Sequence, residues 1–119
     1  MTPFGAKLRE LRQSRSLTQK QMAAALNVSA AYLSALEHGR RSAPSFEFVQ
    51  RVTGYFNIIW DEAEELQRLA AISNPKVSID TSGLSPQATE LANLLAQCIG
   101  SMTKEELKAA LETVKPPKP

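Results

Sequence analysis

The chain has 119 residues, of which 43% are hydrophobic and 22% charged, and its formal net charge is +2. This length allows one hydrophobic core and leaves little room for a second. One cysteine and one histidine exclude a disulfide framework and a Cys/His metal cluster. With no signal peptide, and no apolar run near the ~18 residues of a membrane span, we expect a cytoplasmic protein.

The charges are unevenly distributed along the chain. Residues 1–41 carry seven basic and two acidic side chains, residues 42–72 carry two basic and five acidic, and residues 73–119 carry five of each. A positive first third favours a surface that faces a polyanion. Chance clustering of charges on solvated helices would give the same pattern.

The first predicted helix covers residues 4–15, because Phe4, Leu8 and Leu11 recur at helical spacing. A second helix follows Thr18, which forms a capping box with Gln21. Met22 and Leu26 form the buried stripe of this second helix.

The stretch LTQKQMAAALNVSAAYLSALEHG, residues 17–39, then breaks and resumes. Asn27 tolerates the left-handed conformation that ends a helix without glycine. Ser29 caps a third helix with Leu33 and Leu36 inward, which stops at Gly39. Ala23 is expected where the second and third helices cross. A side chain larger than a methyl group at this point would push the two helices apart.

Two more helices are predicted in the middle of the chain. Ser45 caps a fourth, which ends near Asn57, and a fifth covers residues 59–72. The inward side chains expected on the fourth are Phe46, Val49, Val52 and Phe56. Those expected on the fifth are Ala63, Leu66, Leu69 and Ala70. Trp60 is also expected in the core.

The last third has a different organisation. Residues 73–84 form a linker, or contain a short strand at residues 77–79, where apolar and polar side chains alternate. Residues 85–114 form a helical segment with two helices, capped by Ser85-Pro86 and by Thr103 with Glu106. Residues 115–119, rich in proline, are predicted to be a disordered tail. The inward side chains expected here are Leu91, Leu94, Leu95, Cys98, Ile99, Leu107, Leu111 and Val114.

The two short helices joined at Asn27 have the pattern of a DNA-binding helix-turn-helix, in which the second helix enters the major groove. Small and polar side chains on its outer face suit a close approach to base edges. These outward side chains are Ser29, Ala30, Ala31, Ser34, Ala35 and His38, with Tyr32 at the flank.

Residues 4–72 resemble the XRE family of helix-turn-helix regulators, which includes the lambda-type phage repressors and Cro. The most specific part is LTQKQMAAALNVSAAYLSALEHGRRSAPS, with Asn27 where the family most often has glycine. The resemblance implies a five-helix, lambda-repressor-like DNA-binding domain over residues 1–72. With the C-terminal helical segment predicted above, in which the short strand is an alternative, the expected fold class is all-α.

The resemblance also implies roles for particular residues. Gln19 matches a glutamine that contacts the DNA backbone or bases. Arg12 and Glu37 match a structural ion pair between the first and third helices. Positions that face bases are Ser29, Ala30, Ala31, Ser34 and Ala35. Positions near phosphates are Lys20, Tyr32, His38, Arg40 and Arg41.

Each of these roles has a plainer structural alternative. Tyr32 could cover the flank of the domain, His38 could be an exposed helix end, and Gln19 could serve only to start its helix. Arg40 and Arg41 could lie in a solvated loop. Because alanine makes no bidentate hydrogen bond to a base, specificity would have to come from Ser29, Ser34, Gln19 and DNA shape.

The sequence therefore predicts a sequence-specific DNA-binding transcriptional regulator, a dimer that reads palindromic half-sites. Repression is the default expectation, because a bound dimer would block polymerase, and activation by contact is the alternative. The partners expected are double-stranded DNA and a second copy bound through the C-terminal helices, unless these helices pack on their own domain. One alternative is an antitoxin that also represses its operon, with a toxin or coregulator as protein partner. Another is an adaptor that has lost DNA binding. We expect no cofactor and no enzyme activity, because neither a carboxylate pair nor a phosphate-binding loop is present.

Overall fold

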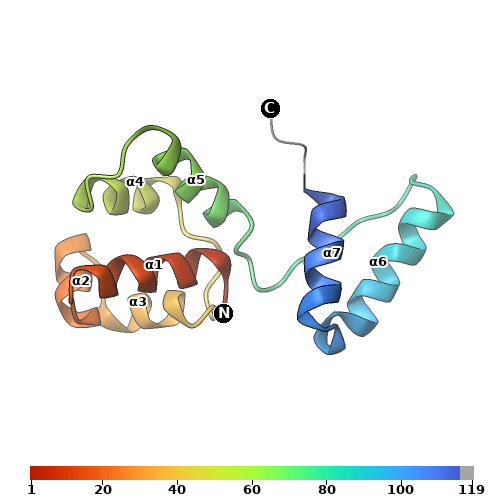
Figure 1. Ribbon diagram of the computed structural model, residues 1–119, viewed down its shortest axis with the longest axis horizontal. Coiled ribbons are helices and arrows are strands. Elements are labelled where there is room, and N and C mark those ends of the chain that lie inside the picture. The colour runs from red at the N-terminus through yellow and green to blue at the C-terminus, as the bar shows by residue number, and fades with distance from the viewer. Residues whose placement is uncertain (116–119) are drawn as a thin grey trace. The chain divides into compact units, whose positions relative to one another are not determined.

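A computed structural model describes residues 1–115 of the chain, and within them every regular element is a helix (Figure 1). The chain divides into two compact units, Met1–Val77 and a second that begins at Ser78. The first unit holds α1 (Pro3–Ser14), α2 (Gln19–Leu26), α3 (Ala30–Glu37), α4 (Phe46–Tyr55) and α5 (Trp60–Ala71). The second holds α6 (Pro86–Cys98), the 3-10 helix η1 (Ile99–Ser101) and α7 (Lys104–Val114).

The predicted all-α fold is confirmed, and the strand considered at residues 77–79 is wrong for this chain. These residues have no regular secondary structure. A strand needs a neighbouring strand to pair with, and within residues 1–115 the segment 77–79 has none. The alternation of apolar and polar side chains alone does not make a strand. Of the tail predicted at residues 115–119, residues 116–119 lie outside the described part. No helix within residues 1–115 is long and apolar enough to cross a membrane.

The predicted helix boundaries rest on local hydrogen bonds. Thr18 Oγ1 accepts a hydrogen bond from the Gln21 backbone N–H (3.0 Å), and the Gln21 side chain accepts one from the Thr18 N–H (2.9 Å). Asn27 ends α2 in the left-handed conformation, with φ 58° and ψ 46°. Ser29 then accepts the Tyr32 N–H at 3.0 Å and starts α3. These caps fix the turn between α2 and α3, as the sequence predicted.

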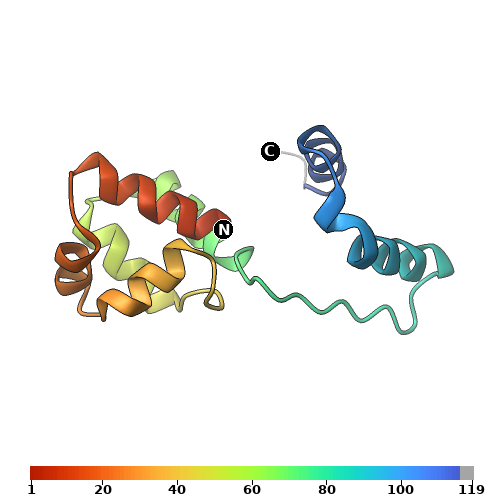
Figure 2. The same cartoon turned by 90° about the horizontal axis from the view of Figure 1, so that it is seen from below.

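The core of the first unit lies between its five helices, which are seen from two sides in Figures 1 and 2. Two aromatic residues are not where the sequence predicted them. Phe46 is 62% exposed, and Phe48 is buried in its place. Phe48 shares one face with Val49, Val52 and Phe56, whereas Phe46 is the first helical residue after the Ser45 cap.

Trp60 is the second misplaced aromatic residue, because it is 82% exposed and therefore not in the core. Leu66 and Ala70 are the buried side chains of α5. Trp60 precedes Leu66 by six residues, which at the helical repeat turns it about 120° away from that face. Its φ of 56° also departs from helical geometry. The burial of Trp60 was predicted from its hydrophobicity alone, but its angular position around α5 places it on the exposed side.

Gly5 marks the closest approach of α1 to α3. A Cβ atom at this position would collide with the carbonyl oxygen of Leu36 and lie 3.2 Å from that of Glu37. Both atoms belong to backbone and cannot rotate away. The α1–α3 spacing therefore requires glycine here.

Replacing Gly5 by alanine should lower the free energy of unfolding by about 1–3 kcal/mol, the usual cost of overpacking. Gly54→Ala is the matched control, because within residues 1–115 a Cβ atom there would meet nothing within 4 Å beyond its chain neighbours and the backbone of α4 itself. That variant should be neutral or more stable by up to ~1 kcal/mol. Urea titration of both variants measures the difference, and equal stability would contradict the close approach of α1 to α3.

The second unit has no buried residue among residues 78–115. The side chains expected inward on α6 and α7 are largely exposed in the single chain, and Cys98 is exposed as well. Leu91, Leu94, Ile99, Leu111 and Val114 expose 50–75% of their surface. Two helices cannot enclose two apolar stripes, because each stripe needs a facing layer. The helices lie where the sequence predicted them, and their apolar stripes, which were expected to be covered by a second copy or by the first unit, are exposed in the single chain. Cys98, expected to be buried, is exposed.

Candidate nucleic-acid interface

The turn between α2 and α3 holds the two helices in close contact and leaves one face of α3 free. Ala23 is buried at this junction, and its carbonyl oxygen accepts the Val28 N–H at 3.0 Å. Leu33 and Leu36 point into the core. Four side chains expected to face outward are exposed, Ser29, Ala30, Ala31 and His38, while Ser34 and Ala35 are half-buried. Apart from His38, the outer face of α3 therefore consists of small side chains.

The C-terminal end of α3 is fixed to α1 by an ion pair. Arg12 donates to both carboxylate oxygens of Glu37, from Nε to Oε2 at 2.8 Å and from Nη2 to Oε1 at 3.0 Å. Its Nη1 also donates to the Leu17 carbonyl oxygen at 2.9 Å. This bidentate geometry sets the orientation of α3 as well as its stability.

Two further side chains, those of Arg9 and Gln19, also contact the Glu37 carboxylate. The sequence does not assign them to this ion pair. Arg9 Nε lies 3.5 Å from Glu37 Oε1, and the Gln19 amide donates to the same oxygen at 3.2 Å. Gln19 was expected to contact DNA, and in this structure its amide nitrogen is turned inward. Both residues lie far from Glu37 in sequence, so spacing alone gave no signal of the contact.

Glu37 stays charged although its side chain is fully buried. Burial alone would raise the pKa of its carboxyl group. Hydrogen bonds from Arg12, Gln19 and Arg9, with the charge of Arg12, outweigh burial and lower the pKa below its ordinary 4.5. A lowered pKa means that the charged form stabilises the fold above pH 4.5, and that this contribution is lost on acidification.

The basic side chains of residues 1–41 separate into two groups. Within residues 1–115, four of them contact carboxylates or backbone carbonyls: Lys7 with Glu10, Arg9 and Arg12 with Glu37, and Arg15 with the Phe56 carbonyl. For Lys20, Arg40 and Arg41, no acceptor lies within hydrogen-bond distance in that part of the chain. Lys20 is the second residue of α2, and Arg40 and Arg41 follow α3, so the positive charge without such a partner belongs to the two helices of the helix-turn-helix and the loop after them.

The other side chains predicted to lie near phosphates belong to α3 or to the residues directly after it: Tyr32, His38, Arg40 and Arg41. The Arg41 guanidinium lies over the Tyr32 ring, 5.2 Å from its centroid, and Tyr32 packs edge-on against Phe48 at 5.7 Å. His38 Nδ1 donates to the Ser34 carbonyl oxygen at 2.7 Å. Arg40 is exposed, and its backbone N–H bonds to the Ala35 carbonyl oxygen. Tyr32 therefore both covers the flank and supports Arg41.

Comparison with known families identifies the class. Residues 3–66 match the model of a family described as "Helix-turn-helix domain", which is more than half of the chain. The chain belongs to this helix-turn-helix family, as the α2–α3 geometry indicates. The resemblance to helix-turn-helix regulators predicted from residues 17–39 is confirmed.

Individual relatives match over the same part of the chain. An "Uncharacterized HTH-type transcriptional regulator RghRB" of Bacillus subtilis is 34% identical over 61 residues, covering 51% of this chain and 44% of the relative. The "HTH-type transcriptional repressor RghR" of the same organism is 36% identical over 61 residues, 51% and 45% respectively. The "HTH-type transcriptional regulator DdrOP3" of Deinococcus deserti is 46% identical over 52 residues, 44% and 40%.

The matched segment therefore spans less than half the length of each of these curated relatives. No solved structure matches the chain significantly.

Proposed function

We propose that the protein is a transcriptional regulator that binds double-stranded DNA with the outer face of α3 in the major groove. The main support is the coincidence of two features in one segment. The helix-turn-helix with the loop after it holds both a helix face of small side chains and Lys20, Arg40 and Arg41, whose charges no group in residues 1–115 neutralises. Phosphate contacts from such cations supply most of the sequence-independent affinity for DNA.

Sequence specificity is proposed to come from a few polar groups and from DNA shape. Ala30 and Ala31 can contact a thymine methyl but cannot hydrogen-bond a base edge. Ser29 and Ser34 supply hydroxyl groups on α3, although Ser29 already caps the helix. Base contacts alone therefore give modest discrimination, and sequence-dependent deformation of the duplex adds to it.

Replacing Arg40 and Arg41 together by alanine should weaken binding to all duplexes and reduce the salt slope of log K by about 2, one for each phosphate contact. Lys7→Ala/Arg68→Ala is the control, because it removes two charges that lie beside Glu10 and Glu65 on the same unit. Fluorescence anisotropy at several salt concentrations measures both slopes. If the Arg40/Arg41 variant kept the wild-type slope, these arginines would not contact phosphates.

We further propose that the protein binds as a homodimer through α6 and α7. One helix-turn-helix reads a single half-site, and dimers of this class bind half-sites about 34 Å apart. The unburied stripe of Leu91, Leu94, Ile99 and Leu111 would gain the facing layer that it lacks in one chain. A dimer seated on a promoter blocks polymerase, so we propose repression, the activity printed in the name of the relative RghR.

Leu94→Asp should convert the dimer to a monomer, because a carboxylate buried in the apolar stripe would be unpaired. Ala96→Asp is the control, since α6 turns residue 96 to the side opposite this stripe. Sedimentation equilibrium should give twice the chain mass for the wild type and the Ala96 variant. A monomeric wild type, or a dimeric Leu94 variant, would contradict this assembly.

A further inference from the structure

A shallow hollow of about 530 Å³ lies beside the C-terminal end of α3 and is formed by two segments distant in sequence. The loop after α3 contributes Gly39, Arg40 and Ser42, and the segment after α5 contributes Asn74, Pro75 and Lys76. From the sequence, residues 73–76 are predicted to be part of a linker. In the structure they lie within the first unit, next to the proposed DNA-binding surface.

The segment after α5 is held in place by two consecutive side chains. Ser73 is buried, its Oγ accepts the Phe4 N–H at 2.9 Å, and its hydroxyl donates to the Leu69 carbonyl oxygen. Asn74 Oδ1 accepts the Ala43 N–H at 2.8 Å, which ties this segment to the loop after α3. Lys76 therefore follows an anchored stretch of backbone rather than a free linker.

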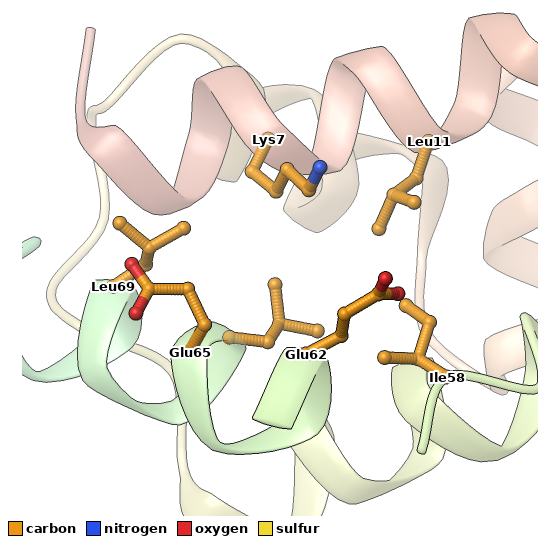
Figure 3. A pocket seen from close by; sticks show the side chains of 7 residues that line it. Lys7, Leu11, Ile58, Glu62, Glu65 and Leu69 are labelled. Atoms are coloured by element: carbon orange, nitrogen blue, oxygen red, sulfur yellow. The ribbon is translucent and has the colours of Figure 1, made fainter. Parts of the chain in front are cut away.

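The charges around this hollow have one sign. Its lining includes two exposed cations, Arg40 and Lys76, and none of its lining residues within residues 1–115 carries a carboxylate. A second cavity of the first unit differs in this respect. Leu11, Ile58 and Leu69 line it together with Lys7, Glu62 and Glu65, so both signs of charge are present; the Glu65 carboxylate is turned toward Leu69 and the Glu62 carboxylate toward Ile58 (Figure 3).

We propose that Lys76 binds a phosphate of the DNA backbone next to the phosphate bound by Arg40, and that Asn74 positions it there. This inference rests on the proposed function and extends its contact surface beyond the helix-turn-helix into the segment after α5. Arg40 and Lys76 are two cations beside a hollow whose described lining residues include no carboxylate. Such a pair is complementary to the regularly spaced phosphate charges along a duplex. A lysine supplies point-charge contact without base specificity, so its effect is the same for every sequence.

The test measures binding of the full chain to a mixed-sequence DNA duplex over a range of salt concentrations. Lys76→Ala should reduce the salt slope by about 1, so that raising salt from about 50 to 200 mM costs roughly fourfold less affinity than in the wild type. Lys7→Ala is the matched control and should leave the slope unchanged. An unchanged slope in Lys76→Ala, or an equal loss in Lys7→Ala, would overturn the inference.

Asn74→Ala tests positioning, because it keeps every charge and removes only the bond to Ala43. It should weaken DNA binding, and combining it with Lys76→Ala should weaken binding no further than Lys76→Ala alone. Additive losses in the double variant would show that Asn74 does not act through Lys76.

If Arg40→Ala/Arg41→Ala lowers the slope and Lys76→Ala does not, only this inference fails. If the wild type binds no duplex, the proposed function fails first.

Discussion

Replacing Arg12 by alanine should lower the free energy of unfolding by about 3–5 kcal/mol, because it leaves Glu37 buried without its main partner. Arg12 makes three hydrogen bonds, two to the Glu37 carboxylate and one to the Leu17 carbonyl oxygen. A loss of this size is a large fraction of the stability of a small domain. Thermal and urea unfolding of the variant measure it.

The controls separate a lost charge from a lost contact. Arg9→Ala should cost much less, because Arg9 is more exposed and its Nε lies 3.5 Å from Glu37. Arg12→Leu/Glu37→Leu should recover much of the loss, since no fully buried charge remains and Arg9, which also loses its partner, is partly exposed to water. If Arg12→Ala were as stable as Arg9→Ala, the ion pair would not hold α3 on α1.

The same ion pair should appear in the pH dependence of stability. In the wild type, the contribution of Glu37 is complete above pH 4.5 and is lost as the pH falls through its lowered pKa. In Arg12→Ala, the hydrogen bond from Arg12, which is the largest influence that lowers the pKa of Glu37, is gone. Burial then raises this pKa relative to the wild type. The variant should therefore lose less stability on acidification than the wild type does.

Replacing Ala31 by glutamate should abolish specific DNA binding while leaving the fold intact. Ala31 is exposed on the outer face of α3, so the longer side chain meets no core residue. In the proposed complex its carboxylate would face the bases between two rows of phosphates. Like charges placed across an interface cost several kcal/mol, which corresponds to a loss of ~100-fold or more.

Gln50→Glu is the control for Ala31→Glu, because it makes the same change of charge at an exposed position on α4. Both variants should keep the wild-type circular dichroism spectrum and melting temperature. Gel-shift titration on the best duplex from in vitro selection compares their affinities. Retained specific binding by Ala31→Glu would show that α3 is not the helix that reads DNA.

Features governed by neighbours in sequence could be predicted, and features governed by distant contacts could not. The caps at Thr18, Ser29 and Ser45 and the left-handed Asn27 depend on three or four residues each, so the turn between α2 and α3 followed directly. The burial of Phe48 in place of Phe46 depends on which face of α4 meets the other helices, which local pattern left undecided.

The candidate site divides in the same way. Its outward residues on α3 follow from helical period, whereas the inward turn of Gln19 depends on Glu37, eighteen residues away. Asn74 and Lys76 come beside the loop after α3 only because α5 brings the chain back to it. That two helices cannot cover the stripe of Leu91 could be predicted from the sequence, whereas the exposure of Cys98 was not predicted.

A crystal structure of the protein bound to its selected duplex tests the central proposal most directly. We expect Ala30 and Ala31 to contact base edges in the major groove, with Arg40 and Arg41 against the flanking phosphates. An α3 whose outer face is turned to solvent, or covered by protein, would contradict the proposed function.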